Sequence, residues 1–185
     1  MRLAAEELEA SDLVTVVDSA NLSTGIGLLV IEAAIMSEKG QSAAEIAATI
    51  ESLKPNVRAS FVVDTLTYLY RGGRCNAVSA MAGGVLRLHP KIVVENGAMD
   101  ASKKYRGKIN SVIMSYVKDM EEDLKSARPE RVFITHSGCD RTTVDAVRSY
   151  LERLGIFHEI LETRAGGVVS SHCGPGTLGV LFIAK

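Results

Sequence analysis

Residues 132–163 read VFITHSGCDRTTVDAVRSYLERLGIFHEILET, and this stretch indicates the fold class. It opens with a short apolar, β-branched run, which is typical of a buried strand. Asp140 suits the N-cap of a helix over 141–154, whose apolar residues recur every three or four positions and which stops at Gly155. A second strand is expected over 156–163. Strand, helix and strand in succession predict an α/β domain.

The segments on either side continue this alternation. A hairpin is predicted from two strands, 89–95 and 98–103, that meet at Asn96-Gly97, a strong type I′ turn signal. A long amphipathic helix is predicted over 105–126, followed after the 132–163 stretch by a final strand over 178–183. The remaining expected elements are helices at 2–10, 24–38, 42–53, 65–71 and 76–85, strands at 13–17 and 59–63, and one helical turn at 166–170.

The first quarter of the chain differs from the rest. The apolar run at 13–17 has the composition of a strand buried on both faces of a parallel sheet. A single strand with helical neighbours cannot form such a sheet, because its backbone groups need partner strands. We therefore interpret residues 1–57 as the C-terminal remnant of a domain whose beginning precedes Met1, and residues 58–185 as an α/β domain with a core of its own.

Composition narrows the class of protein. Apolar residues make up 46% of the 185 residues, and the net charge of −1 argues against a nucleic-acid or membrane-surface binder. The three cysteines, Cys75, Cys139 and Cys173, are odd in number and lack CxxC spacing, which favours reduced thiols in the cytoplasm. The longest apolar stretch, 26–36, is too short to span a bilayer.

Two glycine-containing runs carry the candidate binding chemistry. The first places Arg74 directly after Gly72 and Gly73, and the second places His172 two residues before Gly174. Brought together, the guanidinium and the imidazole would form a receptor for a carboxylate or a phosphate. Two plainer interpretations stay open: Arg74 can cap the carbonyls at the end of a helix, and His172 can pin a loop by a hydrogen bond.

The sequence supports metal binding and catalysis less than it supports anion binding. His136 and Cys139 have a possible zinc spacing, but adjacent His172 and Cys173 would strain tetrahedral geometry, so no metal site and no cofactor are predicted. The chain contains no P-loop or kinase motif. Arg106 stands in the first turn of the predicted helix, where the helix dipole disfavours a cation, and this hints at a role other than helix stability.

Taken in chain order, these motifs resemble those of the DegV family of bacterial fatty-acid-binding proteins, and the resemblance covers nearly the whole chain. Its most specific parts are the GGR run at 72–74 and the HxGPG run at 172–176. The other matching parts are Val17-Asp18-Ser19, Gly25-Ile26-Gly27, residues 64–69, His89-Pro90, Asn96-Gly97 and residues 103–106.

The resemblance implies a parallel-sheet N-terminal domain, a mixed-sheet C-terminal α/β domain and a long-chain fatty acid bound between them. It implies a carrier subunit rather than an enzyme, one that presents the acyl carboxylate to a separate ATP-binding fatty-acid kinase subunit for acyl-phosphate formation. Transient membrane contact and a homo-oligomer are further expectations. The implied ligand-binding residues are His172, Arg74, Gly73 and Gly174, and the implied partner- or phosphate-facing residues are Arg106 and Arg71.

The chain departs from the family pattern at its start. The hydroxyl side chains that hold the carboxylate in the family belong to two N-terminal loops without a counterpart here, so the chain resembles the C-terminal larger part of such a protein. Two alternatives follow. One is a truncated, self-associating interaction fragment with an exposed apolar face at 13–17 and 24–38. The other is a phosphotransferase or acyl-transfer subunit that uses His172.

Overall fold

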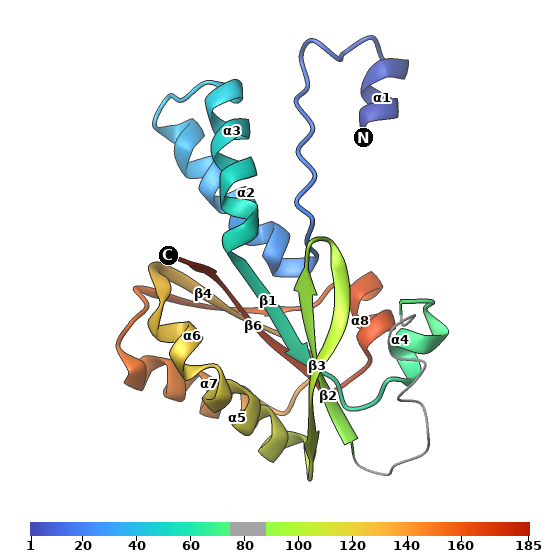
Figure 1. Cartoon of the computed structure of the whole chain (residues 1–185), viewed down its shortest axis with the longest axis vertical. Helices are drawn as coiled ribbons and strands as arrows, with labels where there is room; N and C mark the ends of the chain where they lie inside the picture. The colour runs from blue at the N-terminus through green and yellow to red at the C-terminus, as the bar shows by residue number, and fades with distance from the viewer. Residues whose placement is uncertain (75–87) are drawn as a thin grey trace.

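The computed structural model describes residues 1–74 and 88–185, and the helix predicted at 76–85 lies outside the described residues. A six-stranded mixed sheet runs in the order β3-β2-β1-β6-β4-β5 (Figure 1). All neighbouring strands are antiparallel except β4 and β5, which are parallel. The strands are β1 (Val57–Val62), β2 (Leu88–Glu95), β3 (Ala98–Arg106), β4 (Ala127–Ser137), β5 (Glu159–Arg164) and β6 (Thr177–Ala184).

The strand–helix–strand prediction for 132–163 is confirmed. Helix α7 (Arg141–Leu154) has the predicted bounds and connects the parallel strands β4 and β5. Asp140 is its N-cap residue, although its side chain makes no capping hydrogen bond. Gly155 ends the helix with a φ of 64°, a left-handed conformation that glycine adopts without steric cost.

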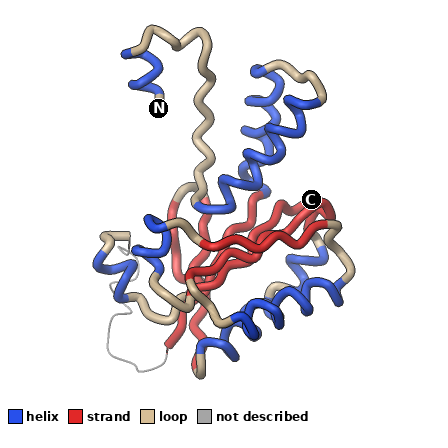
Figure 2. Tube along the Cα trace, turned by 180° about the vertical axis from the view of Figure 1, so that it is seen from behind, coloured by secondary structure: helices blue, strands red, loops and turns tan. Residues whose placement is uncertain are grey.

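Helices cover both faces of the sheet (Figures 1 and 2). On one face α5 (Ile109–Asp119), α6 (Glu121–Lys125) and α7 enclose the larger apolar core, which includes Tyr116, Ile134 and Phe182. On the other face α2 (Ser23–Glu38) packs over β1 and β6, with α3 (Ala43–Leu53) beside it. None of the described helices is long and apolar enough to cross a membrane.

A third, smaller cluster lies near one end of the sheet. Here α4 (Thr67–Arg71) packs against α8 (Gly167–Cys173), with Leu69 and Cys173 buried between the helices and the sheet. Both helices are shorter than two turns, so packing rather than intrinsic helix propensity holds them.

The helix predicted at 105–126 is wrong at its start. Residues 98–106 form β3, and Gly107, with a φ of 134°, separates this strand from the helix that begins at Ile109. Tyr105 fits the helical apolar spacing, but it lies opposite His89 in the β2–β3 pair and is buried there. Arg106 is therefore the last residue of a strand and does not stand in a helical first turn. The helix also breaks at Met120, between α5 and α6.

The strand predicted at 13–17 is absent. This segment does not form a strand, and Figure 1 shows it running away from the sheet toward α1 (Arg2–Glu7). A β-branched run becomes a strand only where a neighbouring strand pairs with its backbone, and none of the described strands pairs with this run. The N–H groups of Leu13 and Val14 donate to the carbonyl of Ala10 instead. Leu13 is 87% exposed. The domain boundary at residues 57 and 58 stays a prediction.

Candidate functional site

An apolar cavity of about 230 Å³ lies on the α2 face of the sheet, between the start of α2 and the short helices α4 and α8. Its apolar walls come from Phe61, Leu69, Met99, Val168, Val169 and Leu181. Its polar lining comes from Arg74, Thr135, His136, Ser137, His172 and Thr177. We call it the α4–α8 cavity.

A glycine in the middle of β6 shapes the floor of this cavity. A Cβ atom on Gly179 would lie 2.7 Å from the carbonyl oxygen of Ser60 on the neighbouring strand and 3.1 Å from Cβ of Phe61. No side chain fits there while the strands stay at this spacing. Glycine in the interior of a strand weakens the strand, and it often marks a place where another group approaches closely. Gly179, Phe61 and Leu181 all belong to the lining of the cavity.

A row of three threonine hydroxyl groups includes that of Thr135, which lines the cavity on the β4 side. Oγ1 of Thr135 lies 2.6 Å from Oγ1 of Thr24 and 3.0 Å from Oγ1 of Thr163. These contacts join the start of α2 to β4 and β5. Because the hydroxyl groups satisfy one another, this wall remains compatible with an apolar ligand although its residues are polar.

The Arg71–Arg74 run forms the C-terminal stop of α4. The Gly73 N–H donates to the carbonyl of Tyr70, and the Arg74 N–H donates to the carbonyl of Leu69. With Gly73 at a φ of 67°, this is the pattern of a Schellman motif. The Arg74 guanidinium also donates from Nη1 to the Gly72 carbonyl at 2.7 Å. In this structure the Arg74 side chain therefore caps a carbonyl at the end of α4, as the helix-capping interpretation predicts.

The two motifs that the sequence singled out meet at the α4–α8 cavity. His172, in the last turn of α8, and Arg74, just beyond α4, both line it although a hundred residues separate them in sequence. Gly174, with a φ of 78°, ends α8 and lies against the ring of Tyr68. The roles of His172, Arg74, Gly73 and Gly174 in ligand binding stay predictions.

The two partner-facing candidates lie elsewhere on the surface. Arg71 is exposed in the last turn of α4, beside the cavity but not in its lining. Arg106 is exposed at the end of β3 and does not line the cavity either. The structure therefore places one of these arginines next to the cavity and the other at the edge of the sheet.

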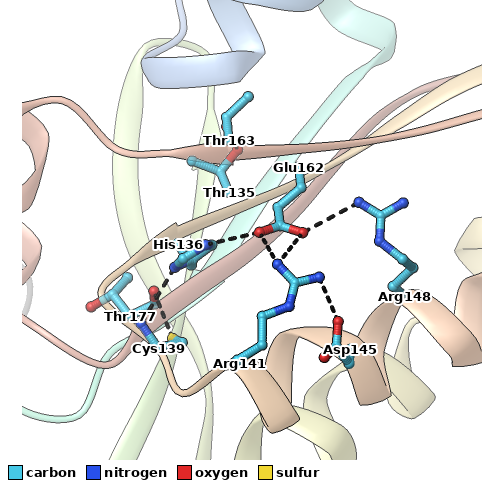
Figure 3. Close-up of polar contacts among 9 residues, drawn as sticks. All are labelled: Thr135, His136, Cys139, Arg141, Asp145, Arg148, Glu162, Thr163 and Thr177. Atoms are coloured by element: carbon cyan, nitrogen blue, oxygen red, sulfur yellow. Dashed lines mark hydrogen bonds and ion pairs between the residues drawn. The ribbon is translucent and has the colours of Figure 1, made fainter.

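A second polar cluster lies where β4 and β5 meet α7 (Figure 3). His136 is buried; its Nδ1 accepts a hydrogen bond from the Cys139 N–H at 3.3 Å, and its Nε2 lies 3.6 Å from Oε1 of Glu162. Partial burial alone would raise the pKa of Glu162. The hydrogen bond from Arg148 and the charge and hydrogen bond of Arg141 outweigh it and hold that pKa below its usual value. This network fastens α7 to the edge strand β5.

The two cysteines that the structure describes, Cys139 and Cys173, lie in poor positions for thiol reactivity. Burial raises the pKa of Cys139 to about 11 and also raises the pKa of Cys173. A nucleophilic or metal-binding cysteine needs the thiolate form, which such an environment disfavours. Within residues 1–74 and 88–185, no group of three or more histidine, cysteine or acidic side chains is arranged to hold a metal ion.

Sequence reasoning missed several residues that shape the site. Thr135 and Gly179 were not among the candidates, yet both line the cavity. Gly72 lies against the ring of His172, which lines it, and Tyr68 lies against Gly174 at the end of α8. Gly72 stands beside the predicted Gly73, and no feature of the sequence distinguishes the two glycines. Only the contact of Gly72 with His172 in the folded chain does so. Gly179 carried the clearest available signal, since it interrupts an otherwise apolar predicted strand.

Comparisons with known proteins identify relatives of this chain. A family model described as an uncharacterised protein of the DegV family matches residues 1–185. A DegV domain-containing protein of Deinococcus radiodurans is 35% identical over 181 residues, which are 97% of this chain and 62% of that relative. One from Caldanaerobacter subterraneus is 30% identical over 183 residues and is covered to 64%. The chain spans about three fifths of the length of the curated relatives it matches.

The solved structures that resemble this chain are also DegV family proteins. A DegV family protein from Thermus thermophilus, described by its fatty acid binding, is 32% identical with a TM-score of 0.86; the match covers 100% of this chain and 65% of that one. DegV of Bacillus subtilis, described as a fatty acid binding protein, is 25% identical with a TM-score of 0.77 and coverages of 96% and 64%. Fatty-acid binding, not catalysis, is the property named for both. This chain belongs to the DegV family.

Proposed function

We propose that this member of the DegV family is a carrier that binds a long-chain fatty acid in the α4–α8 cavity and presents its carboxylate to a separate ATP-binding fatty-acid kinase subunit. The observation that carries the proposal is the cavity itself, whose walls are apolar and whose lining includes the imidazole of His172 and the guanidinium of Arg74. The fatty-acid binding named for two solved relatives supports the choice of ligand.

The chemistry of the cavity suits an acyl chain with an anionic head. Burial of an acyl chain contributes about 0.8 kcal/mol for each CH₂ group removed from water, so the chain supplies most of the affinity. Arginine is a permanent cation and histidine a neutral or cationic donor, and both suit a carboxylate. In this proposal Gly73 and Gly174 contribute by shaping the two loops that bring these side chains together.

A separate kinase subunit is the finer part of the proposal. The chain has no phosphate-binding motif of its own, so an acyl-phosphate would need ATP held by another protein. Arg71 and Arg106 are exposed cations that suit a partner surface or an approaching phosphate. The need for ATP and the predicted reduced thiols support a reaction in the cytoplasm. Val168, which lines the cavity yet is 75% exposed, suits transient contact with a membrane that supplies the fatty acid.

A chain-length series tests the lipid-binding part. Delipidated protein should bind saturated acids with an affinity that rises roughly 15-fold for every two added CH₂ groups until the cavity is full. Val169→Phe, which places a ring in the cavity, should weaken binding and shorten the preferred chain. Val30→Phe makes the same change on an exposed face of α2 outside this cavity and serves as the control. No binding of any C14–C18 acid, with none co-purified, would contradict the proposal.

The kinase part needs its own assay. The lipid-loaded protein is mixed with an ATP-binding fatty-acid kinase subunit, and acyl-phosphate is trapped with hydroxylamine. Arg106→Ala and Arg71→Ala should lower the rate without changing fatty-acid affinity. Unchanged rates in both variants would remove these two arginines from the proposed partner surface.

A second candidate function rests on the exposed apolar surface near the N-terminus. Leu13 and Val30 are 87% and 59% exposed, and an open groove of about 340 Å³ is lined mostly by apolar residues of α2, α3 and residues 15–19. In this alternative residues 1–57 are a remnant of a parallel-sheet domain, and the fragment associates with itself. Val30→Glu should then convert an oligomer to a monomer, and a monomer already present at high concentration would contradict it.

A further inference from the structure

The two short helices beside the cavity are joined by a reciprocal contact in which each places a ring against a glycine of the other. His172 of α8 lies over Gly72 at the end of α4, where a Cβ atom would stand 2.0 Å from Nδ1 of the imidazole. Tyr68 of α4 lies over Gly174 at the end of α8, where a Cβ atom would stand 2.2 Å from Cδ2 of the tyrosine ring. Neither glycine position has room for a side chain while the opposing ring stays in place.

The backbone does not explain why residue 72 is glycine. Gly72 has a φ of −78°, which any L-residue adopts. Gly73, by contrast, has a φ of 67°, and no atom of the described residues lies within 4 Å of a Cβ built on it, so its left-handed conformation at the helix stop is what requires glycine. The two neighbouring glycines therefore meet different needs, and Gly72 is required by the ring of His172.

The contact also restricts where His172 carries its proton. Nδ1 is buried and has no hydrogen-bond partner in the described part of the chain. One α-hydrogen of Gly72 points along the direction in which a Cβ atom would stand 2.0 Å from Nδ1, and this leaves no space for a hydrogen on that nitrogen. A neutral imidazole carries a single N–H group. The proton therefore belongs on Nε2, and the Nδ1 lone pair faces the Cα–H group of Gly72.

We infer that Gly72 is a positioning residue that selects the Nε2–H tautomer of His172, and that Tyr68, seated on Gly174, holds α8 in the place where this contact forms. The inference rests on the proposed function in taking a carboxylate as the ligand. With the proton on Nε2, His172 offers a hydrogen-bond donor to a carboxylate oxygen, and Arg74 offers a second donor from the same lining. The opposite tautomer would present a lone pair and repel the anion.

Nitrogen NMR of the histidine rings tests the inference directly. Two-bond ¹H–¹⁵N spectra of the lipid-free protein are recorded at mildly alkaline pH, and the His172 ring is assigned by its loss in His172→Ala. The wild type should show the pattern of an Nε2–H tautomer. Gly72→Ala should replace it with an averaged or Nδ1–H pattern. Gly167→Ala adds a methyl group to α8 at a position where no atom of residues 1–74 or 88–185 lies within 4 Å, and it should keep the wild-type pattern.

Oleate titration of the same proteins links the tautomer to binding. A lost hydrogen bond to a charged group should weaken binding about tenfold or more in His172→Ala, by a similar factor in Gly72→Ala, and by no further factor in the double variant. Gly167→Ala should stay within about twofold of the wild type.

The outcomes separate this inference from the proposed function. An averaged or Nδ1–H pattern in the wild type overturns the inference, and that measurement needs no variant to fold. A wild-type affinity in Gly72→Ala beside a weakened His172→Ala overturns it as well. A third outcome is that no form of the protein binds oleate while the wild type shows the expected tautomer. This outcome counts against the proposed ligand and leaves the selection of the tautomer by Gly72 supported.

Discussion

The hydroxyl group of Tyr116 offers a sharp test of what holds the centre of the sheet together. Tyr116 of α5 is fully buried, and its hydroxyl accepts a hydrogen bond from the Val180 N–H at 3.0 Å and donates one to the Ser60 carbonyl at 2.8 Å. Oγ of Ser60 lies 2.9 Å away as well. Burial raises the pKa of Tyr116 to about 12, so the hydroxyl keeps its proton throughout the neutral range. Tyr116→Phe removes this one atom.

The expected cost follows from the groups left behind. Phenylalanine fills the same space, so no cavity forms, but the buried Val180 N–H loses its partner. An unsatisfied buried donor costs about 1–3 kcal/mol, and the loss at Ser60 adds to it, so we expect about 2–3 kcal/mol in total. A domain of this size changes its Tm by about 2–4 °C per kcal/mol. Tyr116→Phe should therefore lower Tm by roughly 4–12 °C.

Urea unfolding followed by circular dichroism measures this cost. Tyr150→Phe is the matched control, because the Tyr150 hydroxyl donates to Glu121, whose side chain is 39% exposed, so water can replace the lost hydroxyl at that carboxylate. We expect the control to lose less than about 1 kcal/mol. A loss below about 0.5 kcal/mol in Tyr116→Phe, or equal losses in both variants, would refute the reasoning. Oleate binding should not change in folded Tyr116→Phe, because Tyr116 lies on the opposite face of the sheet from the cavity.

Three further predictions concern stability and reactivity. Ser42→Ala removes half of the capping box that Ser42 forms with Glu45 at the start of α3, and it should cost about 1 kcal/mol in urea unfolding; no measurable change would contradict that role. Because the folded-state pKa of Glu162 lies below its usual value, its ion pairs stabilise the protein above the unfolded pKa of about 4.3 and are lost as pH falls through the folded pKa. The difference in unfolding free energy between the wild type and Glu162→Gln should therefore shrink on acidification, and a growing difference would oppose this reasoning. Burial raises the pKa of Cys139 to about 11 and raises that of Cys173, so peptide-resolved alkylation at neutral pH should be far slower in the folded protein than in urea, and equal rates would show that the thiols are accessible.

Local sequence patterns were enough to predict most of the helices and strands. The bounds of α7 follow from apolar spacing between a capping residue and Gly155, and the hairpin follows from Asn96-Gly97 between two strand-like runs. These signals act over a few residues, so a neighbouring element cannot override them easily. The same reasoning failed at Tyr105, where helical spacing continued into a strand, because pairing with β2 decides its burial and no local signal reports that pairing.

The sequence by itself determined the α/β class, the family and the two motifs that carry polar chemistry, since glycine, proline and apolar periodicity state local backbone preferences directly. Tertiary structure alone decided what those motifs touch. It placed Gly72 under His172 and Gly174 under Tyr68 across a hundred residues of chain, and it moved Arg106 from a predicted helix to the end of a strand. The physical reason is that these contacts depend on how two short helices pack at the end of the sheet, and packing is a property of segments brought together by the whole fold.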